Sequence, residues 1–367
     1  MLLRAVSESI NELAVPYALH WRGKVYALIG LLGLLVAVVI FATTLGSAHI
    51  PFSTCFQVLL SQIPFLHITP SCPATLNIAT LNTIIVDIRL PRILLAGLVG
   101  AALAVAGATY QGLFRNPLAD PYLLGVASGA GLGATVAFLI PFTISWMSLG
   151  AVPLFAFIGA MGAVVVVYSL ARVGKTLPAT TLILAGVALG AFLSSITSYL
   201  MTICGEELHG IVFWLMGGLS LTKWSEVWTV LPCVLVGIVI ICLHARPLNV
   251  MQLDEEQAQQ LGINVERVKL TLLGAATLIT SAAVCFTGLI GFVGIIVPHA
   301  VRLIWGPDHR FLLPLSVLVG AVFLILADTL AHTLLSPTEI PVGVITAFCG
   351  APFFLYLLRR KKGLAFF

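Results

Sequence analysis

Ten apolar runs, most of them close to 20 residues long, constrain this chain more than any other feature. A helix needs about 20 apolar residues to cross a bilayer once. Only 9% of the residues are charged, whereas soluble domains carry roughly 25%. The sequence therefore predicts an all-α polytopic membrane protein with ten transmembrane helices, in which only Thr287-Gly288 divides the seventh span from the eighth. The predicted spans lie near residues 25–45, 93–113, 123–140, 151–171, 180–203, 226–243, 268–287, 289–305, 311–331 and 342–358.

The basic residues predict the orientation of these spans. With both termini on one side, fifteen Lys and Arg residues share that side, and only Arg89, Arg92 and Lys223 lie on the other. Basic residues accumulate on the cytoplasmic side of membrane proteins. We therefore expect a cytoplasmic N-terminus over 1–24, a transmembrane domain over 25–358, and a basic cytoplasmic C-terminus over 359–367. The net charge of +4 is too small to suggest binding to nucleic acid.

The stretch from Arg89 to Gly133 joins two of these spans through a polar turn, RNPLADP. Its many Gly and Ala residues are typical of helices packed closely against other helices in a membrane. The two prolines of the turn, with Asn116 and Asp120, end both flanking helices. We expect this turn to be a functional hinge on the cytoplasmic side.

Arg89 and Arg92 lie on the outer side, where basic residues are disfavoured. One interpretation is a pair of interfacial arginines whose guanidinium groups reach lipid headgroups. The other is an external docking site for an acidic partner or an anionic ligand. The second interpretation is favoured.

Other parts of the outer side are less informative. The connection 46–88 is polar and is predicted to be a loop that covers the outer face, and a disulfide between its Cys55 and Cys72 is an open question. Residues 204–225 are too apolar for a simple loop and favour a short re-entrant or interfacial helix.

The longest inner connection, 246–269, predicts a contact with another protein. Residues 254–260 are polar, rich in helix formers and acidic at their start, and Leu261-Gly262 is typical of a helix end. A short amphipathic helix here has no apolar partner in the chain. We expect a partner protein to cover it, the alternative being a solvated loop.

Two rival classes of function have weaker support. An ion-coupled secondary transporter of a small solute needs ionisable groups at mid-membrane. Asp328 is the only acid well inside an apolar run, with no predicted partner in a neighbouring run, and helix packing is favoured for it over a proton site. An intramembrane enzyme lacks support because the chain has no HExxH or GxSxG motif.

Several long motifs occur in a fixed order: RLPR, GAALAVAG, QGLFRNPLADPYLLGVASGA, PLNV, GFVGIIVPH, DHR, LAD and IPVGVITAFCGAPFF. Together they resemble the FecCD permeases, which are membrane subunits of type II bacterial ABC importers for iron-siderophore complexes, haem and vitamin B12. The resemblance runs from about residue 80 to the end of the chain.

The resemblance implies ten spans with an inverted repeat of spans 2–5 and 7–10, in the bacterial inner membrane and in contact with its lipid. It implies a second permease copy, a homodimer or a heterodimer, two cytoplasmic ATPase subunits and an external substrate-binding protein. ATP and Mg would bind the ATPase partner, with no cofactor and no metal in this chain. An iron-siderophore complex is the favoured cargo, and haem and cobalamin remain open.

The same resemblance implies roles for individual residues. Arg89 and Arg92 would receive acidic residues of the binding protein, and His332 stands where a third docking arginine is expected, which makes that contact weaker or pH-dependent. The expected cytoplasmic gate comprises Asn116 and Leu118 with Ala179 and Thr180, the latter pair in a loop that matches less well. The expected ATPase-coupling residues are Asp254, Glu255, Gln257, Ala258, Leu261 and Gly262.

Overall fold

The computed structural model describes residues 21–46, 50–62, 77–140, 150–174, 176–220, 222–336 and 338–360. Within these ranges the chain is helical, and its only extended pairing is an isolated bridge between Val173 and Thr176. Cys72 of the possible disulfide and both chain termini, whose cytoplasmic position is predicted, lie outside the described residues.

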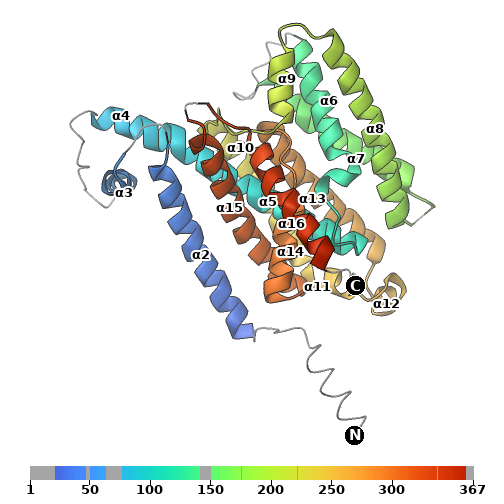
Figure 1. Ribbon diagram of the computed structural model, residues 1–367. Helices are drawn as coiled ribbons and strands as arrows, with labels where there is room; N and C mark the ends of the chain where they lie inside the picture. The colour runs from blue at the N-terminus through green and yellow to red at the C-terminus, as the bar shows by residue number, and fades with distance from the viewer. Residues whose placement is uncertain are drawn as a thin grey trace.

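Each of the ten predicted spans corresponds to a helix, and shorter helices occupy several connections (Figure 1). The helices of the spans are α2 (Trp21–Thr44), α5 (Leu90–Phe114), α6 (Val126–Leu139), α7 (Ala151–Ala171), α8 (Ala179–Ile203), α10 (Trp224–Leu243), α13 (Val265–Thr287), α14 (Val293–Trp305), α15 (His309–Thr333) and α16 (Val342–Arg360). The connecting helices are α3 (Phe52–Ser61), α4 (Ile78–Asn82), the π-helix η1 (Thr83–Arg89), the 3-10 helix η2 (Pro121–Leu124), α9 (Leu208–Leu215), α11 (Ala245–Val250) and α12 (Glu255–Gln260).

Seven of these helical segments are long and apolar enough to cross a membrane, so the protein is a multi-pass membrane protein, and a count of ten crossings stays a prediction. The helices α6 and α14 are shorter, with 14 and 13 residues. The 3-10 helix η2 and one glycine precede α6, and a non-helical stretch precedes α14. Gly125 ahead of α6 has φ +81°, and Gly288 and Phe292 ahead of α14 also have positive φ. Such backbone ends one helix and delays the start of the next.

The outer connection differs from its prediction as a loop. Helices α4, η1 and α5 run on from Ile78 to Phe114 as one segment of 37 residues, so the second span begins well before residue 93. The mainly apolar run at 83–88 continues the helix, and Asn77 caps its start by accepting a hydrogen bond from the Thr80 amide at 2.8 Å. The short helix predicted within 204–225 is confirmed as α9.

Helix α5 lies at the centre of the bundle and is buried along nearly its whole length. Its small residues permit very close contacts with its neighbours. A Cβ atom added to Gly100 would collide with the carbonyl oxygen of Gly320 on α15, and one on Gly107 would collide with that of Gly294 on α14. Close approach of backbones at small residues is the main packing device of membrane helices. The predicted close packing of this stretch is confirmed.

The helix pairings agree with the expected inverted repeat, which itself stays a prediction. Helix α5 packs along α15, and α13 packs along α7. In the expected repeat, α5 corresponds to α13 and α15 corresponds to α7. The repeat therefore relates the α5–α15 pair to the α13–α7 pair.

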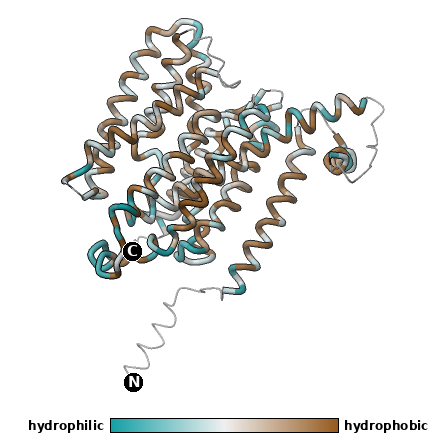
Figure 2. Tube along the Cα trace, turned by 180° about the vertical axis from the view of Figure 1, so that it is seen from behind, coloured by the Kyte–Doolittle hydropathy of each residue, from teal (hydrophilic) through white to brown (hydrophobic). Residues whose placement is uncertain are grey.

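The two ends of the bundle differ in chemistry. Helices α11 and α12 lie at the same end of the bundle as the end of α16, and α4 and α9 lie at the opposite end (Figure 1). The flanks of the helices are mainly apolar, and hydrophilic residues concentrate at the α12 end (Figure 2). With the predicted orientation, the α12 end is the inner end and the α4 and α9 end is the outer one.

Candidate functional site

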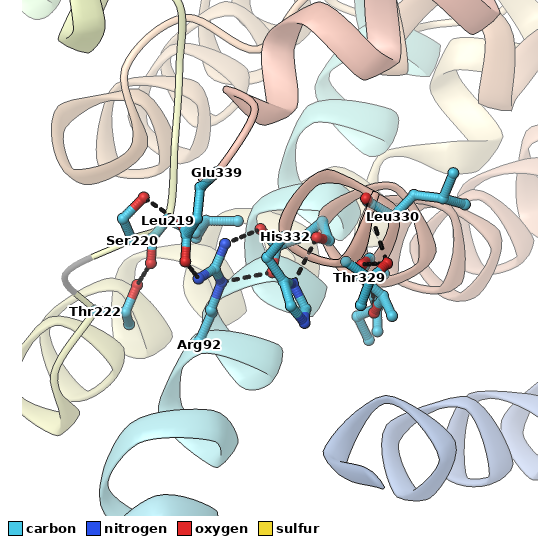
Figure 3. Close-up of polar contacts among 11 residues, drawn as sticks. Arg92, Leu219, Ser220, Thr222, Thr329, Leu330, His332 and Glu339 are labelled. Carbon is cyan, nitrogen blue, oxygen red and sulfur yellow. Dashed lines mark hydrogen bonds and ion pairs between the residues drawn. The ribbon is translucent and has the colours of Figure 1, made fainter. Parts of the chain in front are cut away.

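An ion cluster whose central pair is shielded from solvent occupies the outer end of α5. The guanidinium group of Arg92 donates two hydrogen bonds to Asp328, from Nε to Oδ2 at 2.8 Å and from NH2 to Oδ1 at 2.9 Å. Its NH1 donates to Oε1 of Glu339 at 2.9 Å. Figure 3 shows the side chain of Arg92 directed between Glu339 and the α15 turn that carries His332. The cluster joins α5, α15 and the segment before α16.

Arg92 and Asp328 are both well shielded, with side chains 14% and 3% exposed. The prediction that Asp328 lacks a partner in a neighbouring run is therefore wrong. Sequence periodicity could not reveal the pair because its members lie on helices far apart in the chain. The packing role favoured for Asp328 takes the form of an ion pair between α5 and α15, and Arg92 does not extend freely toward lipid headgroups.

Glu339 completes the cluster and was not identified from the sequence. Its second carboxylate oxygen accepts a hydrogen bond from the Ser220 hydroxyl at 2.7 Å. Burial acts to raise the pKa of Glu339, but the hydrogen bonds from Arg92 and Ser220 outweigh it and hold the pKa below its usual value. The predicted topology already placed Glu339 and Arg92 on the same side of the membrane. That was the one sequence signal that could have suggested a contact between them.

The other two predicted docking residues have different surroundings. Arg89 is directed at the end of the first span, where its NH1 donates to the carbonyl oxygen of Thr43 at 2.7 Å. His332 lies in the last turn of α15, with Nδ1 at 2.8 Å from the carbonyl oxygen of Asp328 and 3.9 Å from its Oδ2. The structure thus brings His332 and Arg92 together through Asp328, and Arg89 contacts a different element.

At the inner end, the turn after α5 is held by its own side chains. Arg115 adopts a left-handed conformation with φ 48° and ends α5. The Asn116 side chain accepts a hydrogen bond from the Leu118 amide at 2.9 Å, and that of Asp120 accepts one from the Tyr122 amide at 2.8 Å. Leu118 remains exposed at 39%. The two predicted gate residues of this turn, Asn116 and Leu118, therefore belong to one rigid unit with an exposed apolar tip.

Asp120 and Tyr122 connect this turn to the interior. Burial raises the pKa of the Asp120 carboxyl to about 6, although the hydrogen bond from the Tyr122 amide opposes the shift. The Tyr122 hydroxyl donates to the carbonyl oxygen of Ile290 at 2.9 Å and accepts from its amide at 3.1 Å. The turn is thereby attached to the non-helical stretch between α13 and α14.

The other predicted gate residues, Ala179 and Thr180, begin α8. Pro178 precedes them in an extended conformation as the cap of the helix, and Thr180 is exposed. Ala179 lines a small void together with Leu113 and Phe114 at the end of α5. Both predicted gate elements therefore lie at the inner end, next to the end of α5.

The short helix predicted in the inner connection is confirmed as α12, and its role in coupling to an ATPase stays a prediction. Asp254 is its N-cap and accepts a hydrogen bond from the Glu255 amide at 2.7 Å, and Ala258 is fully buried. The helix ends at Gln260. The amide of Leu261, its C-cap residue, donates to the carbonyl oxygen of Gln257, and Gly262 follows with φ +82°. Two leucines that flank the helix, Leu253 and Leu261, are 64% and 66% exposed.

A cavity of about 530 Å³ opens between η2, α6 and α8. Its lining is unusual for a lipid-facing surface because small and hydroxyl-bearing side chains follow one face of α8. Exposed serines continue along that helix at positions 194, 195 and 198. The residues that line the cavity from α6 and α8 include Ser128, Gly131, Gly190, Ser194, Thr197 and Ser198.

The chain is similar over most of its length to known transport proteins. A model of the FecCD transport family matches residues 34–360. The cobalamin import system permease protein BtuC of Halobacterium salinarum is 43% identical over 354 residues, which cover 90% of this chain and 94% of that protein. The hemin transport system permease protein HmuU of Yersinia pestis is 43% identical over 278 residues, which cover 75% of this chain and 83% of that protein.

A solved structure agrees with these relatives. It is described as a metal-chelate type ABC transporter in an inward-facing conformation, and it superposes with a TM-score of 0.77 at 32% identity. The match covers 91% of this chain and 98% of the solved one. The fold and the sequence therefore lead to the same family.

Proposed function

The chain belongs to the FecCD transport family, and from this premise we propose that it is the permease subunit of an ATP-driven importer whose cargo is a metal chelate. The chain itself would form the path across the membrane, and a separate ATPase would hydrolyse ATP with its Mg. Relatives named for cobalamin and hemin transport, and a solved structure named for metal chelates, support a large chelate as cargo. Iron-siderophore, haem and corrinoid complexes all belong to this class.

The observation that carries the proposal is the exposed helix α12 at the inner end. It projects from the bundle (Figure 1) and lies in the polar region of Figure 2. Leu253 and Leu261 flank it, each about two-thirds exposed in a segment outside the membrane-crossing helices. Exposed apolar side chains in a polar setting are typical of a protein interface. An ATPase subunit is the partner that fits this position.

A second copy of the chain would complete the path. The cavity beside α8 is open on one side, and the exposed serines of α8 suit a water-filled or polar path better than lipid. Apolar side chains on the same helix, Leu184 and Tyr199 among them, are 70% and 65% exposed and would contact the second copy or the lipid. Such a lining offers few directional contacts to cargo, so an external binding protein would set most of the specificity.

The outer cluster would receive that binding protein. Arg92 carries the charge that an acidic surface would recognise, and Asp328 accepts hydrogen bonds from two of its three guanidinium nitrogens. Glu339 holds the remaining nitrogen at the more exposed side, with its own side chain 33% exposed. We therefore place docking at Arg92 and His332, with Arg89 as a separate contact near the end of α2.

Alternating access would follow from movement at both ends. ATP binding would draw the two ATPase subunits together and displace the two copies of α12. The turn at 115–121 and the start of α8 would then open or close the inner end, with Asn116, Leu118, Ala179 and Thr180 as the gate. Conformational changes of this kind need contacts that differ between two states.

Replacement of the exposed leucines tests the proposed ATPase contact. In Leu253→Asp and Leu261→Asp variants we expect the co-expressed ATPase to be lost from the purified complex, while the permease itself is still recovered from the membrane. Leu335→Asp is the matched control, because Leu335 is 60% exposed at the outer end. Retention of the ATPase by both inner variants would contradict the proposal.

A further inference from the structure

Two adjacent acids at the start of α12 contact two different parts of the inner end. Asp254 accepts from NH1 of Arg115 at 3.4 Å, beside Asn116 of the first proposed gate element. Glu255 accepts from Nζ of Lys269 at 2.7 Å. The first contact is largely exposed, at 43% for Arg115 and 50% for Asp254, and pairs of that kind contribute little. The second contact is shielded and short.

Lys269 lies in the second turn of α13 and is only 5% exposed. Its ammonium group makes three contacts, one to each of three segments. It donates to Oε2 of Glu255 on α12 at 2.7 Å, to the carbonyl oxygen of Leu177 at 3.1 Å and to Oε1 of Glu266 at 3.4 Å. Leu177 lies immediately before Pro178, the cap of α8, so its carbonyl group is next to the second proposed gate element.

An ammonium group has three donors and no acceptor. In a site shielded from water, each donor that loses its partner leaves a polar group unsatisfied, and loss of the carboxylate leaves a buried charge. Displacement of α12 away from Lys269 is therefore unfavourable unless the Lys269 side chain and the Leu177 segment follow. Helix α8 begins only two residues after Leu177, so a displacement of Leu177 should also displace the start of α8.

From this arrangement we infer that Lys269 is a positioning residue that transmits displacement of α12 to the start of α8, and hence to the inner gate. The inference rests on the proposed function, in which α12 contacts the ATPase. It names a side chain that lies in neither α12 nor the gate and that connects them through one ammonium group.

Four variants separate the contacts of Lys269. Lys269→Met removes all three donors and keeps much of the volume. Lys269→Arg keeps the charge and several donors. Glu255→Gln weakens the contact to α12 alone. The exchange Lys269→Glu with Glu255→Lys restores an ion pair, but a carboxylate cannot donate to the Leu177 carbonyl group. Arg310→Met is the matched control, because Arg310 is a 56% exposed inner basic residue whose ion-pair partner, Asp308, lies two positions away.

The experiment measures ATP hydrolysis and cargo uptake in the same proteoliposomes, with the ATPase and the binding protein present. We expect Lys269→Met to hydrolyse ATP while the cargo imported per ATP falls by about tenfold, since a hydrogen bond to a charged group contributes enough free energy for that factor. Lys269→Arg should retain most of the wild-type ratio of cargo imported to ATP hydrolysed. The charge exchange should fail to restore it, and Arg310→Met should match the wild type.

An unchanged ratio in Lys269→Met, or full recovery in the charge exchange, would overturn the inference. If the wild-type complex itself shows no ATP-dependent uptake, the proposed function fails instead, and the two failures are distinguishable. If Lys269→Met does not fold, the link is tested instead with Glu255→Gln, by measuring amide hydrogen exchange at residues 177–182. Addition of the ATPase and ATP should change exchange there in the wild type and not in Glu255→Gln, and equal changes in both would refute the link.

Discussion

Arg92 on α5 and Asp328 on α15 form a two-point ion pair across 236 positions of the sequence, with both contacts shorter than 3 Å. The pair fastens the outer ends of two helices whose backbones touch further in, where Gly100 meets Gly320. It also gives the one acid predicted within an apolar run a structural partner. Asp328 is thereby less suited to carry a coupling ion, because its charge is already matched.

The ion pair predicts a strong dependence of stability on either partner alone. Asp328→Ala should lower the free energy of unfolding by about 3 kcal/mol, because it leaves a shielded guanidinium with Glu339 as its remaining partner. The double variant Arg92→Met with Asp328→Ala should recover part of that loss. Unfolding by a denaturing detergent measures both, and strictly additive effects would rule out a coupled pair.

The contact between Glu339 and Arg92 should weaken the affinity of the permease for the binding protein. Glu339→Gln removes the charge that holds NH1 of Arg92, so the guanidinium should accept an external carboxylate more readily. We expect docking to strengthen about two- to fivefold, since a partly exposed pair contributes less than about 1 kcal/mol. Titration of the binding protein onto the permease in nanodiscs measures this. Ser220→Ala is the control that keeps the charge, and weaker docking of Glu339→Gln would contradict the competition.

Asp120 predicts a pH dependence of opposite sign to that of most carboxylates. Its pKa is raised from 3.8 to about 6, so the fold favours the protonated form. Stability should fall as the pH rises from about 4 through 6 and level off above that range. Asp120→Asn keeps the acceptor for the Tyr122 amide and should stabilise the protein at pH 7 by about 2 kcal/mol, less than the full shift implies because the residue retains some contact with solvent.

Asp308 supplies the contrast for that measurement. Hydrogen bonds from Arg310 hold the pKa of Asp308 well below its usual value, so its contribution is present above the unfolded pKa and is lost as the pH falls. Asp308→Asn should therefore destabilise the protein at pH 7. Unfolding curves between pH 4 and pH 8 give the change in stability for each variant. A change of the same sign at pH 7 for Asp120→Asn and Asp308→Asn would refute the raised pKa of Asp120.

The sequence predicted the helices well and the side-chain partners poorly. Apolar runs and the polar turn at 115–121 identify the spans and their inner connections, because length and composition alone decide what a bilayer accepts. The same signals located α12 through its acids and its Leu261-Gly262 end. Neither the partner of Asp328 nor the continuation of α5 back to Ile78 follows from periodicity, since both depend on which helices meet in three dimensions.

The role of Lys269 shows the same limit. In the sequence it is one of many basic residues on the inner side and serves only the orientation argument. Its significance arises from the convergence of Glu255 and the Leu177 carbonyl group on one ammonium. Contacts between residues that lie 92 positions apart require the fold.

The glycine contact between α5 and α15 predicts a local sensitivity to volume. Gly100→Ala places a Cβ against the backbone of Gly320, which cannot retreat as a flexible side chain could, and should destabilise the protein by about 1–3 kcal/mol. Gly274→Ala on α13 is the matched control, because its Cβ would meet no atom within 4 Å. That variant should be neutral or slightly stabilising, as alanine favours helices. Equal stabilities of the two variants would contradict the packing described for α5.

As a FecCD permease, this chain should import a metal chelate with energy from ATP that a partner subunit hydrolyses. The most direct measurement is uptake of a radiolabelled ferric siderophore, haem or cobalamin into proteoliposomes that contain the permease with its ATPase, the binding protein being outside. We predict uptake of at least one of these cargoes that requires ATP and the binding protein and persists when ion gradients are collapsed. Uptake that continues without ATP hydrolysis and disappears with the ion gradient would contradict the account.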